Sequence, residues 1–253
     1  MPAARVIARL DIKGPNLVKG IRLEGLRVMG DPRAFARRYY EAGVDELLYV
    51  DIVASLYGRN SILDVVRRTA EDVFVPLTVA GGLRSVDDVR AALRSGADKV
   101  AINTAAVADP ELIRRVAEAF GSQCLVLSVQ TKRVGPGRWE AYTDNGRERS
   151  GRDALEWVQE GVARGAGELL VTSVDHEGMR KGLDLEFLAR VVPAVGVPVI
   201  ACGGAGGPAD VRAAIEAGAD AVALASILHY GAHTVADVKA HLAAAAVPVR
   251  SSA

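Results

Sequence analysis

An internal repeat constrains the fold of this 253-residue chain more than any other feature of its sequence. Residues 76–104 return 122 positions later as residues 198–226, and 13 of the 29 aligned positions are identical. The same offset aligns ELLYVDI, which starts at Glu46, with ELLVTSV, which starts at Glu168. Self-similarity over this length indicates that one structural unit occurs twice in the chain.

Short apolar runs rich in β-branched residues alternate with longer amphipathic stretches, which is typical of parallel strands connected by helices. The predicted strands cover residues 5–12, 46–52, 77–81, 99–103, 124–130, 168–174, 199–202 and 221–225. The predicted helices cover residues 32–41, 85–95, 109–120, 151–164, 185–192 and 208–217. An open doubly wound sheet shares this alternation, but eight strands in two repeated halves favour a closed barrel.

We therefore predict one α/β domain, a single (β/α)8 TIM barrel that spans residues 1–253. Its two half-barrels are expected to cover roughly residues 1–122 and 123–245. The chain length is typical of this fold. The hydrophobic content of 50% is sufficient for a large core and argues against disorder.

Charge and composition exclude several classes of function. The formal net charge is zero and no basic block occurs, so we expect no nucleic-acid partner. No apolar run is long enough to span a bilayer, and the first residues carry charges where a signal peptide needs apolar ones. Cys124 and Cys202 form no metal or redox motif. We expect a cytoplasmic protein without membrane association, metal or cofactor.

Each half of the chain carries a glycine pair where a predicted strand ends and small residues, mostly polar, where the next strand ends. Backbone N–H groups at glycines and at helix starts bind phosphate, and barrel enzymes often hold phosphate at such places. The alternative is a pair of tight turns without a ligand, but two related copies favour two phosphate sites and a substrate with a phosphate at each end. The first phosphate site comprises Gly81, Gly82, Asn103 and Thr104, and the second comprises Gly203, Gly204, Ala225 and Ser226, with Thr172, Glu177 and Gly178 as further substrate-binding candidates.

Four charged residues stand at the starts of predicted strands: Arg5, Glu46, Lys99 and Glu168. Period-two alternation places them on the face of each strand that lines the barrel interior. Unpaired buried charges are very costly, so the two cations and two anions should pair in a closed ring at the barrel floor. Such a ring either controls passage through the floor or only stabilises it.

Longer motifs resemble one known family over essentially the full chain. They are VKG at Val18, GDP at Gly30, DELLYVDI at Asp45, GADKVAINTAA at Gly96, FGSQ at Phe120, RGAGELLVTS at Arg164 and GGAG at Gly203. In this order they resemble the cyclase subunit of imidazole glycerol phosphate synthase. The related phosphoribosyl isomerase shares the half-barrel repeat and the two phosphate sites, but GADKVAINTAA and FGSQ are not expected in it.

The resemblance implies a two-protein enzyme. A glutaminase partner releases ammonia, which crosses the barrel and reacts with a phosphoribulosyl-formimino aminoimidazole carboxamide ribotide. The products are imidazole glycerol phosphate and an aminoimidazole carboxamide ribotide. The resemblance also implies that the ring of four charges is the ammonia gate, that Asp98 faces the glutaminase, and that two aspartates serve as general acid and base.

The candidate reaction centre departs from the family at one of these aspartates. Asp11 ends the first strand, with Lys19 nearby on the following segment. The equivalent position on the fifth strand is Gln130. An amide can orient a substrate but cannot exchange a proton at neutral pH. General acid–base help contributes roughly 10²–10⁴-fold in rate, so Gln130 bears directly on whether the family reaction survives.

Two further departures fall inside the barrel. Arg9 replaces a small family residue and, by alternation, lies between the ring and Asp11, where it should lower the carboxyl pKa and occupy the path of ammonia. A benign alternative is that Arg9 snorkels or pairs with Asp51. Cys202 replaces serine and is expected mainly to pack, with a nucleophilic role as the alternative.

Three functional hypotheses fit these residues. The first is a working cyclase with Asp11 as principal catalyst and Gln130 as an orienting group. The second is a diverged paralogue that channels ammonia to another amidation, for example of a sugar in polysaccharide synthesis. The third is a non-catalytic subunit that binds a bis-phosphate ligand and activates its glutaminase. Most of the ligand-binding set is present, so the cyclase is preferred.

Overall fold

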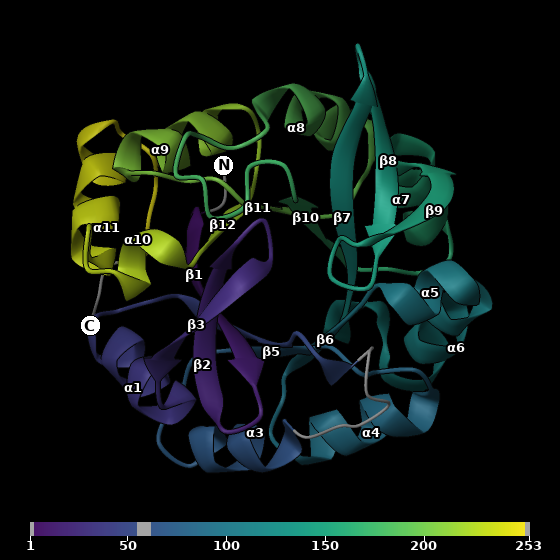
Figure 1. The fold of residues 1–253 in the computed structure, drawn as a ribbon, viewed down its shortest axis with the longest axis horizontal. Helices are drawn as coiled ribbons and strands as arrows, with labels where there is room; N and C mark the ends of the chain where they lie inside the picture. The colour runs from purple at the N-terminus through teal and green to yellow at the C-terminus, as the bar shows by residue number, and fades with distance from the viewer. Residues whose placement is uncertain (1–2, 55–61, 251–253) are drawn as a thin grey trace.

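The chain forms a closed parallel β-barrel surrounded by helices in the computed structural model, which describes residues 3–54 and 62–250. Figure 1 looks down this barrel and shows the strands as an inner ring. The ring closes because β7 pairs with β10 as well as with β6. In spatial order its strands are β1 (Arg5–Lys13), β4 (Glu46–Asp51), β5 (Leu77–Ala80), β6 (Lys99–Ile102), β7 (Leu125–Gly135), β10 (Glu168–Ser173), β11 (Val199–Cys202) and β12 (Ala221–Leu224).

Helices pack on the outside of this ring and connect its strands. In the described part of the chain they are α1 (Pro32–Glu41), α3 (Leu63–Ala70), α4 (Val86–Arg94), α5 (Thr104–Ala108), α6 (Glu111–Phe120), α7 (Ala154–Ala163), α8 (Leu185–Val191), α9 (Pro208–Glu216), α10 (Ser226–His229) and α11 (Val235–Ala244). Two short 3-10 turns, η1 (Ser122–Cys124) and η2 (Val192–Ala194), complete the set. No helix among these residues is long and apolar enough to cross a membrane.

Local sequence signals explain where several helices begin. Asp31 caps α1 by accepting a hydrogen bond from the Arg33 N–H at 2.8 Å, and Pro32 follows at the first helical position. Ser85 caps α4 and Thr234 caps α11 in the same way, each bonding an N–H three residues later. Each capped helix then turns its apolar side to the barrel.

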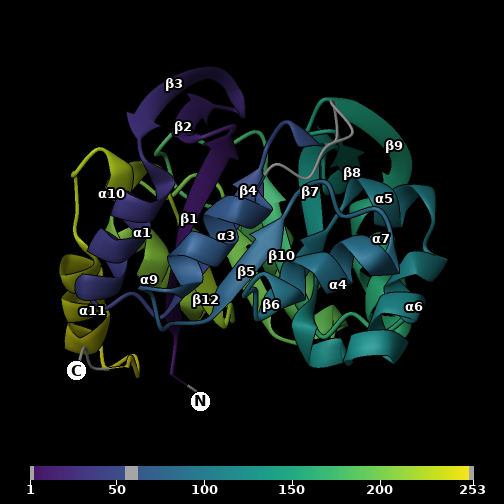
Figure 2. The ribbon, with the colours of Figure 1, turned by 90° about the horizontal axis from the view of Figure 1, so that it is seen from below.

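Two antiparallel hairpins extend the barrel at one end. The chain forms β2 (Asn16–Ile21) and β3 (Glu24–Gly30) after β1, and β8 (Arg138–Thr143) and β9 (Glu148–Asp153) after β7. Both bounds of β8 lie 122 residues after those of β2, the offset of the sequence repeat. Figure 2 shows both hairpins at the same end of the barrel, opposite the N-terminus.

The comparison with the sequence prediction confirms the fold class. All eight predicted barrel strands and all six predicted helices are present, with ends shifted by a few residues. The prediction missed both hairpins and the helices α3, α5, α10 and α11. The hairpins escaped because β3 and β9 expose most of their residues, so neither strand carries a buried apolar face that a pattern could reveal.

A buried ion pair holds the last helix against the barrel. Lys239 of α11 donates to an Asp45 carboxylate oxygen at 2.8 Å, and the other Asp45 oxygen accepts from the Val6 N–H at 2.7 Å. Both side chains are largely buried. Removing one partner of a buried pair typically costs about 3–5 kcal/mol because the other charge is left uncompensated.

We therefore expect Lys239→Met to lower the free energy of unfolding by about 3 kcal/mol, measured by urea denaturation. The control is Arg212→Met, which breaks the exposed pair between Arg212 and Glu216 on α9. Exposed pairs contribute about 0–1 kcal/mol, so the control should change little. Equal losses in the two variants would contradict the interpretation of Lys239.

Candidate active site

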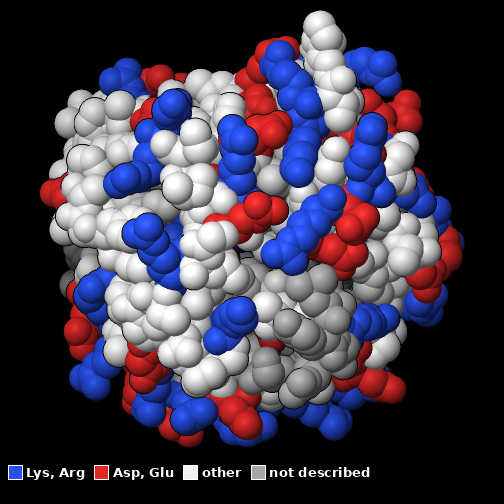
Figure 3. Space-filling model, viewed as in Figure 1, with Lys and Arg blue, Asp and Glu red and all other residues white. Residues whose placement is uncertain are grey.

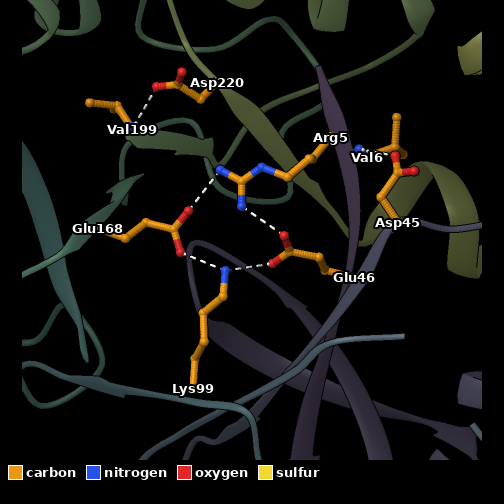
Figure 4. A network of polar contacts seen from close by, with 8 residues as sticks. All are labelled: Arg5, Val6, Asp45, Glu46, Lys99, Glu168, Val199 and Asp220. Carbon is orange, nitrogen blue, oxygen red and sulfur yellow. Dashed lines mark hydrogen bonds and ion pairs between the residues drawn. The ribbon is translucent and has the colours of Figure 1, made fainter. Parts of the chain in front are cut away.

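The four charged residues at the strand starts form the closed ring that the sequence predicts (Figure 4). Arg5 donates to Glu46 and to Glu168, each at 2.7 Å. Lys99 bonds the second oxygen of each carboxylate, at 3.0 Å to Glu46 and 2.8 Å to Glu168. Each charge thus has two partners of opposite sign, which compensates for the burial of the carboxylates. Burial lowers the pKa of the Arg5 guanidinium, but Glu168 and Glu46 outweigh it, so the net shift is upward.

Asp98 has a local role beside this ring. It accepts a hydrogen bond from the Leu77 N–H at 2.8 Å and remains exposed. Asp220 bonds the Val199 N–H in the same manner, as Asp45 does for the N–H of Val6 (Figure 4). Asp98 therefore belongs to a set of aspartates that hold neighbouring strand starts together, and its expected contact with a glutaminase stays a prediction.

Inward-pointing side chains stack in layers of four above the ring. Each layer takes one residue from every second strand, as the inward–outward alternation of side chains and the strand register require. The first layers are apolar apart from Thr78. The first contains Ile7, Thr78, Val126 and Ile200, and the second contains Leu48, Ala101, Leu170 and Ala223. The layers therefore separate the charged floor from the polar upper part of the barrel.

A second buried charge cluster lies above these layers. Arg9 donates through Nε to Asp11 Oδ1 at 2.8 Å, and Lys19 lies 3.2 Å from Asp11 Oδ2. Lys19 also bonds Glu177, so the cluster holds two cations and two anions. All four side chains are at most about 5% exposed. Arg9 therefore pairs with Asp11, and the alternative pairing with Asp51 is wrong.

The cations of this cluster keep Asp11 ionised. Burial alone would raise the pKa of the Asp11 carboxyl, but the charges of Arg9 and Lys19 outweigh burial and lower it to about 2. This confirms the direction expected from the sequence. Burial lowers the pKa of Lys19, but Glu177 and Asp11 raise it more, so the ammonium stays charged. A carboxylate with so low a pKa is a weak proton acceptor while both cations remain in place.

This pKa predicts a pH-dependent stability difference. The folded-state pKa of Asp11 is depressed, so its pairing stabilises the fold fully above about pH 4 and is lost as the pH falls toward about 2. We expect Arg9→Met to lower the free energy of unfolding at neutral pH and to lower it less near pH 2. Denaturant unfolding of both proteins across this range measures the difference, and a gap that stays constant with pH would contradict the pairing.

Gln130 lies across the barrel from Asp11. Alternation and register place Asp11, Gly82, Gln130 and Gly204 in one layer at the barrel mouth, with β1 and β7 on opposite sides. The Gln130 side-chain oxygen is buried and has no hydrogen-bond partner among the described residues. Thr172 stands between Gln130 and Cys202 in the strand register. The site therefore presents a carboxylate on one side and an amide on the other.

The residues of the two predicted phosphate sites come together at two cavities, and their binding of phosphate stays a prediction. All four residues of the first site line a cavity of about 370 Å³, together with Gln130. All four residues of the second site line a smaller cavity of about 20 Å³ with Glu177, Gly178 and Cys202. Gly81 and Gly204 have positive φ, and a Cβ on either would lie 2.2 Å from a backbone oxygen, so close backbone approach requires glycine. Figure 3 shows several Lys and Arg side chains around the end of the barrel that carries the two hairpins.

The hairpin β2–β3 reaches over the second phosphate site. The Arg22 N–H donates to the Glu177 carbonyl at 2.8 Å, and the Asn145 amide from the other hairpin donates to the Leu23 carbonyl at 3.3 Å. Leu23 is buried with a positive φ, so packing holds its backbone in an unfavourable region. The hairpin places Lys19 above Asp11.

The structure adds cavity-lining residues that sequence reasoning missed. Arg84, Asn145 and Asp51 line the first cavity. Asp51 is buried and accepts from the Val53 N–H at 3.1 Å. Arg84 lies two residues after the first glycine pair and Asn145 begins an Asn-Gly turn, so the sequence around each residue could have indicated its place at the cavity. The position of Asp51 at the cavity carried none.

Comparisons with known proteins agree with this geometry. The family model described as histidine biosynthesis protein matches residues 5–234. A protein of Legionella pneumophila named imidazole glycerol phosphate synthase subunit HisF is 59% identical over 81% of this chain and 97% of its own. Proteins of the same name from Myxococcus xanthus and Mycobacteroides abscessus are 53% and 52% identical, over 99% and 98% of this chain and 99% of each relative. The chain belongs to the family of imidazole glycerol phosphate synthase subunit HisF, the cyclase subunit of that enzyme.

Proposed function

We propose that this chain performs the cyclase reaction with Asp11 as its principal catalytic group. The observation that carries this proposal is the buried cluster of Asp11, Lys19 and Glu177 between two glycine-rich cavities that are related by the sequence repeat. The substrate is a phosphoribulosyl-formimino aminoimidazole carboxamide ribotide. Its two phosphates occupy the two phosphate sites, so its reactive linker crosses the layer that contains Asp11 and Gln130.

The charge pattern suggests how substrate binding activates Asp11. In the free site Arg9 and Lys19 hold this carboxylate at a pKa of about 2. A substrate phosphate competes for these cations, and each cation drawn away raises the basicity of Asp11. Asp11 then accepts a proton from the attacking nitrogen, while Lys19 remains charged and stabilises negative charge on the substrate.

Gln130 has an orienting role in this proposal. Its amide can hydrogen-bond the linker from the side opposite Asp11 but exchanges no proton. The chain therefore relies on one carboxylate where the family uses two. Cys202 takes no nucleophilic role here, because burial raises the pKa of its thiol despite the nearby Arg9 charge.

We infer that a glutaminase subunit docks on the barrel floor and supplies ammonia. A surface cavity of about 330 Å³ leads to the ring, and Arg5, Lys99 and Glu168 line it. The exposed Asp98 lies at the same end of the barrel. The ring is the gate for ammonia in this proposal, and the working location is the cytoplasm.

The relatives do not favour the other two hypotheses. Proteins that are 50–59% identical carry one name, the HisF subunit. A sugar-amidation paralogue and a non-catalytic activator gain no support from them. The proposal needs a direct test because Gln130 cannot exchange a proton.

Complementation provides this test. We expect the gene to restore growth without histidine to a bacterial strain that lacks its cyclase subunit, and Asp11→Asn to abolish the rescue. The strain's own glutaminase has to recognise the foreign barrel, so the experiment is repeated with excess ammonium. No growth under either condition, with folded protein present in the cells, would overturn the proposal.

A further inference from the structure

The guanidinium of Arg9 lies on one side of the barrel interior. It shares a layer with Ala80, Ser128 and Cys202, as alternation and register place them. Its Nη1 lies 3.2 Å from Cys202 Sγ, while its Nε bonds Asp11. The guanidinium therefore covers the sector between β1 and β11. The other members of the layer are small, and Arg9 is only 3% exposed.

The opposite sector of the same layer is open. The cavity of about 370 Å³ is lined by Gln130, Ser128, Ala80 and Ala101, which are inward-facing residues of β5, β6 and β7. Ser128 and Ala80 stand at the level of Arg9, and Ala101 stands one layer lower. The cavity thus passes Arg9 on the side that the guanidinium leaves free.

The lower end of this cavity approaches the ring. Ala101 is two residues beyond Lys99 on β6, which corresponds to roughly 7 Å along the strand. One mostly apolar layer, with Thr78 as its only polar member, fills the intervening space. Neutral ammonia suits such a segment better than the ammonium ion, because burying an unpaired charge is far more costly.

We propose that ammonia rises along the wall formed by β5, β6 and β7 and reaches the site on the Gln130 side, and that Cys202 keeps Arg9 out of this path. This inference rests on the proposed function. It links the two departures inside the barrel, Arg9 and Cys202. The long side chain of Arg9 is tolerated because its guanidinium is held by the contact with Cys202. Cys202 is a positioning residue that acts through Arg9.

The test compares two substitutions in one layer. In the complex with the glutaminase, turnover is measured with glutamine and, separately, with an ammonium salt, which does not need the floor. Ala101→Leu narrows the open wall, and Ala223→Leu adds the same bulk to the covered side. We expect the ratio of glutamine-driven to ammonium-driven turnover to fall about tenfold in Ala101→Leu, the effect of a barrier of about 1.4 kcal/mol, and to stay unchanged in Ala223→Leu.

A general loss of folding or chemistry lowers both rates and leaves the ratio unchanged, so the ratio reports passage alone. Equal ratios in the two variants would overturn the proposed path. Absence of ammonium-driven turnover in the unmodified complex would instead overturn the proposed function, so the two failures are distinguishable.

The role of Cys202 has its own readout. Cys202→Ala removes the contact with Arg9 and should lower the ratio, whereas Cys202→Ser retains a hydrogen-bond acceptor and should preserve it. Adding Arg9→Ala to Cys202→Ala removes the obstructing side chain and should restore the ratio. A ratio that is unaffected by Cys202→Ala would show that Cys202 does not position Arg9.

Discussion

Asp11→Asn should lower ammonium-driven turnover by roughly 10²–10⁴-fold, the range that general acid–base groups contribute. Asparagine retains an oxygen that can accept from Arg9 or Lys19, so we expect the geometry of the site and the substrate affinity to change little. The free energy of unfolding should fall, because two buried cations then face Glu177 alone. What is lost is the proton acceptor. Steady-state kinetics with the isolated chain separates kcat from KM, and the loss should appear in kcat.

Asp31→Asn is the matched control. Asp31 is an exposed cap of α1, and asparagine caps helices about as well as aspartate. Its turnover should equal that of the unmodified protein. If Asp11→Asn retained full activity, another group would have to accept the proton, and the central assignment of the site would be wrong.

Gln130→Asp should raise ammonium-driven turnover, by up to roughly 10²-fold. The side-chain oxygen of Gln130 is buried without a partner among the described residues, directly across the mouth from Asp11. A carboxyl group there adds a second proton-exchanging group at the position where the family is expected to carry aspartate. The pH profile of kcat should then gain a new limb, since a further titrating group enters the rate.

Gln130→Asn controls for the shorter side chain in this experiment. It matches aspartate in size but cannot titrate, so its turnover should not exceed that of the unmodified protein. If Gln130→Asp lowered turnover as much as Gln130→Asn, the amide itself would be the functional group at this position, and the interpretation of Gln130 as a lost carboxylate would fail.

The repeat carried most of what could be predicted about the fold. It indicates which strands correspond, and the strand register then brings Asp11 and Gln130 into one layer. Alternation alone placed Arg5, Glu46, Lys99 and Glu168 on the inner face, and the cost of burying charge predicted their mutual pairing. These inferences succeeded because a closed barrel leaves an inward side chain few directions to point.

Features set by side-chain direction within the barrel were beyond the sequence. The alternation of side chains along the first strand placed Arg9 in the barrel interior. The direction of its side chain toward Cys202 depends on which neighbouring residues are small and on the position of Asp11. The sequence therefore predicted an obstruction, whereas the structure shows a covered sector beside an open one. The hairpins were missed because β3 and β9 expose most of their residues, so no buried apolar face marks these strands in the sequence.

The most direct test of the central claim is turnover of the isolated chain with the bis-phosphate substrate and ammonium salt, with imidazole glycerol phosphate detected as product. We predict product formation that saturates with substrate and disappears in Asp11→Asn. Substrate binding at both phosphate sites without any cyclised product would contradict the account, because the barrel would then hold the family ligand without performing the family reaction.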